Sequence, residues 1–155
     1  MSPNDAAFEK MLSALPVTTY HAGETILRDG SKTGRLFILK SGEVAVVKNS
    51  AELARVDQPH AVFGELAALL DQPHGADVRA LQDSAFHVAD VTLLEKDSVL
   101  LLAVGRTLAR RFVIANEGLV ALKKEIQTGQ SPSGVRNVIA KMETQMMATQ
   151  ILIPF

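Results

Sequence analysis

The sequence predicts a mainly β domain flanked by helices, of the double-stranded β-helix or jelly-roll kind, followed by one long helix. Short alternating runs of about five or six residues fill its first half, a length typical of strands. Glycine and polar turn signals separate them at intervals of about 8–12 residues, as in a sandwich or barrel. Helical periodicity replaces this pattern at both ends. The expected segments are an N-terminal helix in 1–16, a β-roll in 17–96, a long helix in 97–127, and a linker with a short amphipathic tail in 128–155.

Composition narrows the class of protein. The chain has 155 residues, of which 47% are hydrophobic, so it can bury a core of its own. A net charge of −1 argues against broad binding to nucleic acid or membrane surfaces. Cysteine is absent, which excludes a disulfide framework and thiolate chemistry. The N-terminus is polar, unlike a signal peptide, and no apolar run approaches the ~18 residues of a membrane span, so we expect a soluble cytoplasmic protein.

The sequence predicts one N-terminal helix followed by seven strands. A first helix over residues 2–15 has Ser2 as its cap and Pro3 at its first position, and Pro16 ends it. One face of this helix is apolar at helical spacing: Phe8, Met11, Leu12 and Leu15. Seven strands are expected at 17–21, 24–28, 35–40, 43–48, 52–57, 76–81 and 84–90.

The long helix carries an apolar seam whose members are alternately four and three residues apart. They are Leu108, Phe112, Ala115, Leu119, Leu122 and Ile126. Such a heptad pattern predicts a parallel two-fold homodimer, although the seam could instead pack only on its own domain. Two basic pairs, Arg110-Arg111 and Lys123-Lys124, are interpreted as the solvated face.

The tail contains a linker at 128–134 and then another amphipathic helix, for which Ser131 and Pro132 give the start signal. The chain ends in the apolar residues ILIPF. Exposed alone they would be adhesive, so we expect them to dock on the domain, on a second chain or on a protein partner.

Residues 63–80, called the cradle, have the layout of an anion-binding segment. Gly64 makes a turn before Glu65, a short apolar helical run follows, and a turn at Pro73 and Gly75 leads into a strand. Backbone N–H groups and a helix N-terminus then converge on one point. Such an arrangement suits a phosphate more often than any other anion.

Five short motifs, in order, resemble the cyclic nucleotide-binding domain family. They are Gly23-Glu24-Thr25-Ile26 with Asp29-Gly30, Leu36-Phe37-Ile38-Leu39 with Ser41-Gly42, Phe63-Gly64-Glu65-Leu66-Ala67, Pro73 leading to Ala76-x-Val78-x-Ala80, and the helix LARRFVIANEGLVALKKEI. The resemblance covers roughly residues 8–127. It implies a jelly-roll β-roll with a C-terminal dimer and lid helix.

The resemblance also implies a binding site. Its ligand-contacting residues would be Phe63, Gly64, Glu65, Leu66, Ala67, His74, Gly75 and Ala76. Glu65 would bind the ribose 2′-hydroxyl, and the N–H groups of Gly64 and Glu65 would face the phosphate. His74 stands where the family has its phosphate-binding arginine, and Asp77 where it commonly has threonine. A histidine of ordinary pKa is charged only about a quarter of the time at pH 7. Losing a charge-assisted bond costs about 1.5–3 kcal/mol, so weakened phosphate binding is expected.

Two simpler interpretations of these residues stay open. Glu65 could merely begin a helix, where its charge suits the helix dipole. His74 could be a solvated turn residue rather than a pH-sensitive phosphate contact. The other histidines, His21, His60 and His87, lie in different strands or strand ends without a recognisable set of metal ligands.

We therefore expect a regulatory sensor of cyclic AMP, cyclic GMP or a related anionic ligand, with no required cofactor. The alternatives are an interaction and dimerisation module whose pocket has lost its ligand, and a sensor of another ligand such as haem. Catalysis is not expected, because no nucleophile–base pair or paired carboxylates can be argued from spacing. Direct DNA binding is not expected either, because the residues after Gln127 are too few and not basic.

Overall fold

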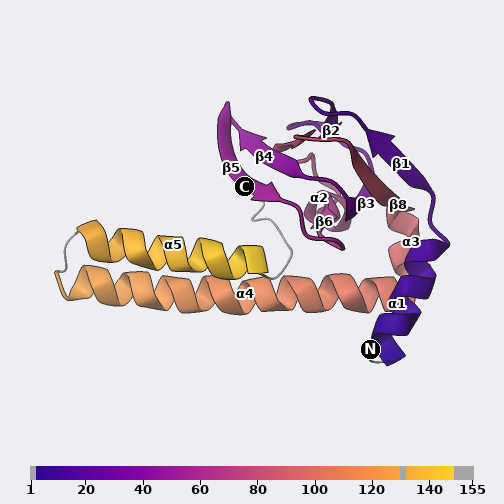
Figure 1. Cartoon of the computed structure of the whole chain (residues 1–155). Helices are drawn as coiled ribbons and strands as arrows, with labels where there is room; N and C mark the ends of the chain where they lie inside the picture. Colours follow the sequence, from indigo (N-terminus) through magenta and orange to yellow (C-terminus); the bar gives the residue numbers. More distant parts are fainter. Residues whose placement is uncertain (1–2, 130–131, 149–155) are drawn as a thin grey trace.

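The computed structural model describes residues 3–129 and 132–148 and shows a β-roll seated on a helical hairpin (Figure 1). The helices are α1 (Pro3–Ser13), α2 (Glu65–Leu70), α3 (Val91–Lys96), α4 (Ser98–Gln127) and α5 (Pro132–Ala148). The strands are β1 (Val17–Tyr20), β2 (Thr25–Leu27), β3 (Arg35–Ser41), β4 (Val44–Lys48), β5 (Ala51–Val56), β6 (Val62–Phe63), β7 (Asp77–Ala80) and β8 (Ser84–Asp90).

The strands form two antiparallel sheets that face each other. One has the order β1-β8-β3-β6 and the other β2-β7-β4-β5. Phe86 is fully buried between them, and its ring makes edge-to-face contacts with Tyr20, Phe37 and Phe63 at centroid distances of 5.8, 6.2 and 6.0 Å. This geometry is the one that aromatic pairs prefer. The core of the roll is therefore organised around one aromatic side chain.

A second apolar cluster joins the roll to its helices. Strand β3 is buried on both faces: Phe37 and Leu39 face the inside of the roll, while Leu36 and Ile38 pack with the helices. The helical side of this cluster includes Leu12 of α1, Leu94 of α3, and Leu100 and Val104 of α4. Since buried apolar area is the main stabilising term, this cluster fixes α4 against the roll.

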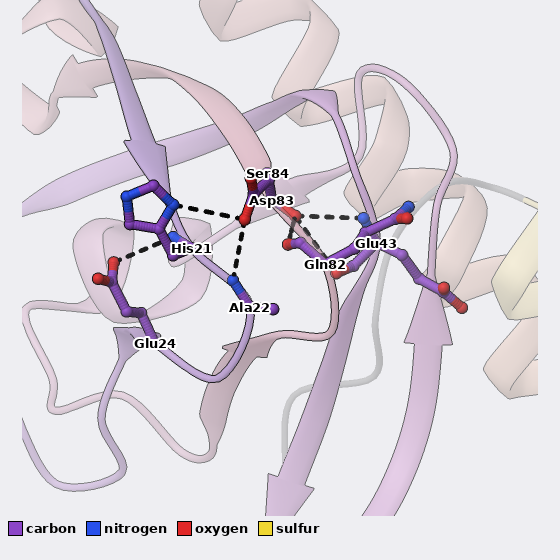
Figure 2. A network of polar contacts seen from close by, with 7 residues as sticks. All are labelled: His21, Ala22, Glu24, Glu43, Gln82, Asp83 and Ser84. Carbon is purple, nitrogen blue, oxygen red and sulfur yellow. Dashed lines mark hydrogen bonds and ion pairs between the residues drawn. The ribbon is translucent and has the colours of Figure 1, made fainter.

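A polar network closes one corner of the roll (Figure 2). The Asp83 carboxylate accepts a hydrogen bond from the Ala22 N–H at 3.2 Å and lies 3.4 Å from the His21 ring. Next to Asp83, the Glu43 N–H donates a hydrogen bond to the Ser84 hydroxyl at 3.2 Å. Gly42, with a φ of 104°, lies so close that a Cβ there would collide with Ser84. Glycine is required at this hairpin because only it combines positive φ with such close approach.

Helices α4 and α5 form an antiparallel hairpin (Figure 1). They approach closely at Gly118, where a Cβ would collide with the Met142 side chain, and at Gly134, which lies against Glu125. Gly118 therefore serves helix packing despite its low helix propensity. The predicted linker at 128–134 is too long, because α5 begins at Pro132.

The predicted seam is divided among different environments. Leu108 packs on the second core cluster, and Ala115 and Leu122 are half-buried. Phe112, Leu119 and Ile126 are 67%, 62% and 72% exposed, so α5 covers a different face. The alternative, in which the seam packs only on its own domain, is wrong for these three residues.

The mainly β class with flanking helices and a long helix is confirmed, with eight antiparallel strands and an α4 of 30 residues. Seven strands were expected; the eighth is β6, a two-residue strand paired with β3. Helix α3 is separate from α4, with caps at Asp90 and Asp97. Among the described residues, no helix is long and apolar enough to cross a membrane. Ser2, Ser131 and the terminal ILIPF lie outside the described residues.

Candidate functional site

The cradle lines a cavity with a volume of about 270 Å³ on the β2-β7-β4-β5 side of the roll. All eight predicted ligand-contacting residues line it: Phe63, Gly64, Glu65, Leu66, Ala67, His74, Gly75 and Ala76. The rest of the lining is mainly apolar and comes from Leu27, Val46, Val62, Leu70, Gln72, Pro73 and Val78. The fold thus brings together residues from four strands, one helix and the turns between them around a concave space, as binding sites require.

Gly64 makes the sharp turn between β6 and α2. Its φ of 84° lies in the left-handed region, and a Cβ would fall 2.8 Å from the Arg35 carbonyl oxygen and 3.3 Å from His74 Cε1. Only glycine fits this position without strain. The turn places Glu65 at the first position of α2, with its side chain directed into the protein.

The Glu65 carboxylate is held by an arginine of the long helix. Arg111 Nη1 donates a hydrogen bond to Glu65 Oε1 at 2.9 Å, and the two side chains are only 7% and 5% exposed. Glu65 belongs to the cavity lining and Arg111 to the middle of α4. A buried ion pair therefore joins the cradle directly to the long helix.

Burial dominates the electrostatics of this pair. It raises the pKa of Glu65, and the charge and hydrogen bond of Arg111 offset this only in part. Burial likewise lowers the pKa of Arg111, against the opposing effect of Glu65. Each charge depends on its partner, because an uncompensated charge in this environment is strongly unfavourable.

The prediction that Arg110 and Arg111 both lie on a solvated face is wrong for Arg111. A sequence signal for its burial exists. Arg111 continues the stripe of Leu100, Val104 and Leu108 at helical spacing, and all three pack in the second core cluster. A basic residue in line with an apolar stripe needs a buried partner, and Glu65 supplies it.

His74, whose ring lies close to Gly64, is 5% exposed and is not a solvated turn residue. Its ring Nε2 lies 2.9 Å from the Thr33 hydroxyl oxygen. Its backbone pairs with Ser31 and Gly30, both at 2.8 Å. Burial lowers the pKa of His74 below its ordinary value, which favours the neutral ring.

Asp77 does not line the cavity. Its carboxylate accepts hydrogen bonds from the Asp29 N–H at 2.8 Å and from Arg79 at 2.7 Å. These bonds, led by the one from Asp29, lower the pKa of Asp77. Its charge is therefore held on the outer side of the strand, consistent with the alternation of side chains along β7.

The histidines are spread over the roll rather than gathered. His21 faces Asp83 and His60 lies 3.0 Å from Glu9, on different elements. Across residues 3–129 and 132–148, no group of three or more histidine and acidic side chains is placed to hold a metal ion. The polar groups of the cavity lining are therefore the Glu65 carboxylate, the His74 imidazole, the Gln72 amide and backbone groups.

Comparison with known proteins assigns the family. The model of the cyclic nucleotide-binding domain matches residues 17–96, just over half of the chain, and the chain belongs to this family. The matched segment is the β-roll with the cradle inside it. The chain covers less than a tenth of the curated kinase and less than half of the solved structure given below.

Individual relatives agree with this assignment. A cGMP-dependent protein kinase of Toxoplasma gondii is 38% identical over 77 residues, which is 50% of this chain but only 8% of the kinase. The structure is similar to cAMP-bound PfPKA-R, with a TM-score of 0.61 and 22% identity over 87% of this chain and 44% of that one. It is also similar to a regulatory subunit of a cAMP-independent protein kinase A from Trypanosoma cruzi, bound to guanosine. That match has a TM-score of 0.54 and 23% identity, and it covers 66% of this chain and 36% of the other.

Proposed function

We propose that this chain is a ligand-responsive regulatory module in which a nucleotide-type small molecule enters the cradle and changes the position of α4. The observation that carries this proposal is the buried Glu65–Arg111 pair, because one partner lines the cavity and the other belongs to the long helix. A ligand that interacts differently with two positions of α4 can shift the equilibrium between them.

The pair gives this coupling a chemical form. Glu65 offers its carboxylate to one guanidinium in a site from which water is largely excluded. A ligand hydroxyl that donates to the same carboxylate competes with Arg111 or shares the carboxylate with it. Either event changes the electrostatic environment of Arg111, so ligand binding in the cavity would affect α4.

The candidate ligands are cyclic AMP, cyclic GMP and related molecules, and the module needs neither a cofactor nor catalysis for this role. The two solved neighbours carry different ligands, cAMP and guanosine. Their likeness to this chain is one of fold, so the choice of ligand rests on the lining of its own cavity. The module would act in the cytoplasm on a partner or domain that carries the effector activity.

The exposed part of the seam supports a second part of the proposal, a parallel homodimer through α4. Phe112, Leu119 and Ile126 recur every seven residues and are each more than 60% exposed. Val113 and Val120 widen the stripe on the same side of the helix. A heptad repeat of exposed apolar residues on a helix fits a second copy of the same helix.

Calorimetric titration tests ligand binding. The wild-type protein is titrated with cyclic AMP, cyclic GMP, adenosine and guanosine, and saturable binding of at least one is expected. Glu65→Gln should weaken it, because a neutral amide accepts a hydroxyl proton less strongly than a carboxylate does. Glu52→Gln, on the surface of β5, is the matched control and should leave affinity unchanged. Absence of binding at millimolar concentration would refute the proposal and favour an interaction module with a degenerate pocket.

Light scattering tests the dimer. Wild-type protein should have the mass of two chains, and Leu119→Asp should have the mass of one. Leu53→Asp, a partly exposed leucine on β5, introduces the same charge away from α4 and should leave the dimer intact. An unchanged dimer for Leu119→Asp would show that α4 is not the interface.

A further inference from the structure

The cavity contains very little positive charge. Among its lining residues only Glu65 and His74 are ionisable, and neither lysine nor arginine contributes to the lining described by the structure. The Arg111 guanidinium is engaged by the Glu65 carboxylate at 2.9 Å. The imidazole of His74 is buried against Thr33, and burial lowers its pKa, which favours the uncharged ring.

Three cations near the cradle are paired with carboxylates outside the cavity lining. Lys32 lies 2.9 Å from Asp71, just beyond the end of α2. Arg79 bonds to Asp77 at 2.7 Å, outside the cavity lining. Lys48 is likewise paired, with Asp29 at 2.9 Å. Each of these pairs is on the outer surface of the roll, where its charge is screened by water.

A cyclic phosphate in this cavity would lose hydration without gaining a cation. Burying a charge is favourable only when it is paired and hydrogen-bonded. The cavity fits the uncharged base and sugar of a nucleotide better than it fits the phosphate. The walls of Leu27, Val46 and Val78 offer apolar surface to a base, and the Glu65 carboxylate offers an acceptor to a sugar hydroxyl.

We propose that the natural ligand of this cavity is an uncharged ribonucleoside, bound in preference to the corresponding cyclic nucleotide. This inference rests on the proposed function, since it names the class of ligand that the cradle takes. It departs from the expectation of an anionic ligand because the residues at the phosphate end, His74 and Gly75, supply no charge. A missing charge-assisted bond corresponds to about a 10–150-fold change in affinity.

The test compares the dissociation constants of guanosine with cyclic GMP, and of adenosine with cyclic AMP, for the wild-type chain at pH 7.5. The nucleoside of at least one pair should bind about 10-fold more tightly or better. Equal or tighter binding of both cyclic nucleotides would overturn the inference while the proposed function stands. Absence of binding by all four would overturn both.

Two further measurements sharpen the test. His74→Arg restores a permanent cation at the phosphate end and should shift the preference toward the cyclic nucleotide by about 10–150-fold. His21→Arg adds the same charge at the exposed corner of the roll and should leave the ratio unchanged. If His74→Arg does not fold, the wild-type ratio decides alone. A 2′- or 3′-deoxynucleoside should bind more weakly than its parent, and equal binding of both deoxy forms would overturn the Glu65 contact and the assignment of a ribonucleoside.

Discussion

Glu65 and His74 are the two buried ionisable side chains of the cavity lining, but they connect to different parts of the molecule. Glu65 is bonded to Arg111 of the long helix. His74 is bonded to Thr33 of the roll itself. The first contact links the cavity to α4, and the second holds the cradle to the loop before β3.

Under the proposed function, this difference separates the response to a ligand from its recognition. A change at Glu65 alters the partner of Arg111 on α4 and would affect the position of that helix. A change at His74 would alter which ligand fits, because it changes the charge available to a phosphate.

The largest effect is expected from Arg111→Ala. It leaves the Glu65 carboxylate buried without its partner, which should lower the free energy of unfolding by about 3–5 kcal/mol. Urea unfolding measures this, with Arg110→Ala, an exposed neighbour on α4, as the control that should change little. The double variant Glu65→Leu with Arg111→Met should recover most of the loss, because an apolar pair can replace a buried ion pair. A loss below about 1 kcal/mol for Arg111→Ala would contradict burial of the pair.

Gly64→Ala should have a smaller effect, of about 1–3 kcal/mol, because the new Cβ requires left-handed backbone and meets the Arg35 carbonyl. The same unfolding experiment measures it. Gly105→Ala in α4 is the matched control, since nothing lies within 4 Å of its added Cβ. That control should stabilise the protein by up to about 1 kcal/mol. Equal effects of the two substitutions would show that the turn before α2 is relaxed.

The smallest effect is expected from His74 and depends on pH. Burial lowers the pKa of His74, so the unfolded chain binds more protons than the folded one once the pH falls below about 6.5. Stability should therefore decrease as the pH falls through this region and stop responding to His74 below its folded pKa. His74→Gln should remove a slope of at most about 1.4 kcal/mol per pH unit. His21→Gln, exposed at the corner of the roll, serves as control, and an unchanged slope for His74→Gln would contradict a buried neutral ring.

The sequence was sufficient for the roll and for the position of the cradle. Its turn signals fall at regular intervals. Gly42 and Gly64 each mark a turn with a positive φ, a conformation that favours glycine. Strand β6 was missed because its two residues are too few for an alternation pattern and stand directly before the Gly64 turn. All eight expected cradle residues share one cavity, whereas their contacts with a ligand stay a prediction.

The partners of the cradle could not be predicted because they come from far along the chain. Arg111 is 46 residues from Glu65, and Thr33 is 41 residues from His74. The apolar stripe before Arg111 indicates that this residue is buried, but it does not name the residue that it meets. For His74, a turn position gives no sign of burial, which arises only when the loop before β3 packs on the cradle. The split of the α4 seam has the same origin, because α5 could have covered either side of that helix.

Amide hydrogen exchange of the wild-type chain tests the central claim, that occupancy of the cradle is transmitted to α4, most directly. Exchange is compared with and without a saturating ligand from the titrations above. We expect altered exchange both in the cradle and in residues 104–118 of α4, around Arg111. In Glu65→Gln, saturated with the same ligand, only the cradle should respond. Protection of the cradle with unchanged exchange in residues 104–118 of the wild-type chain would contradict the coupling.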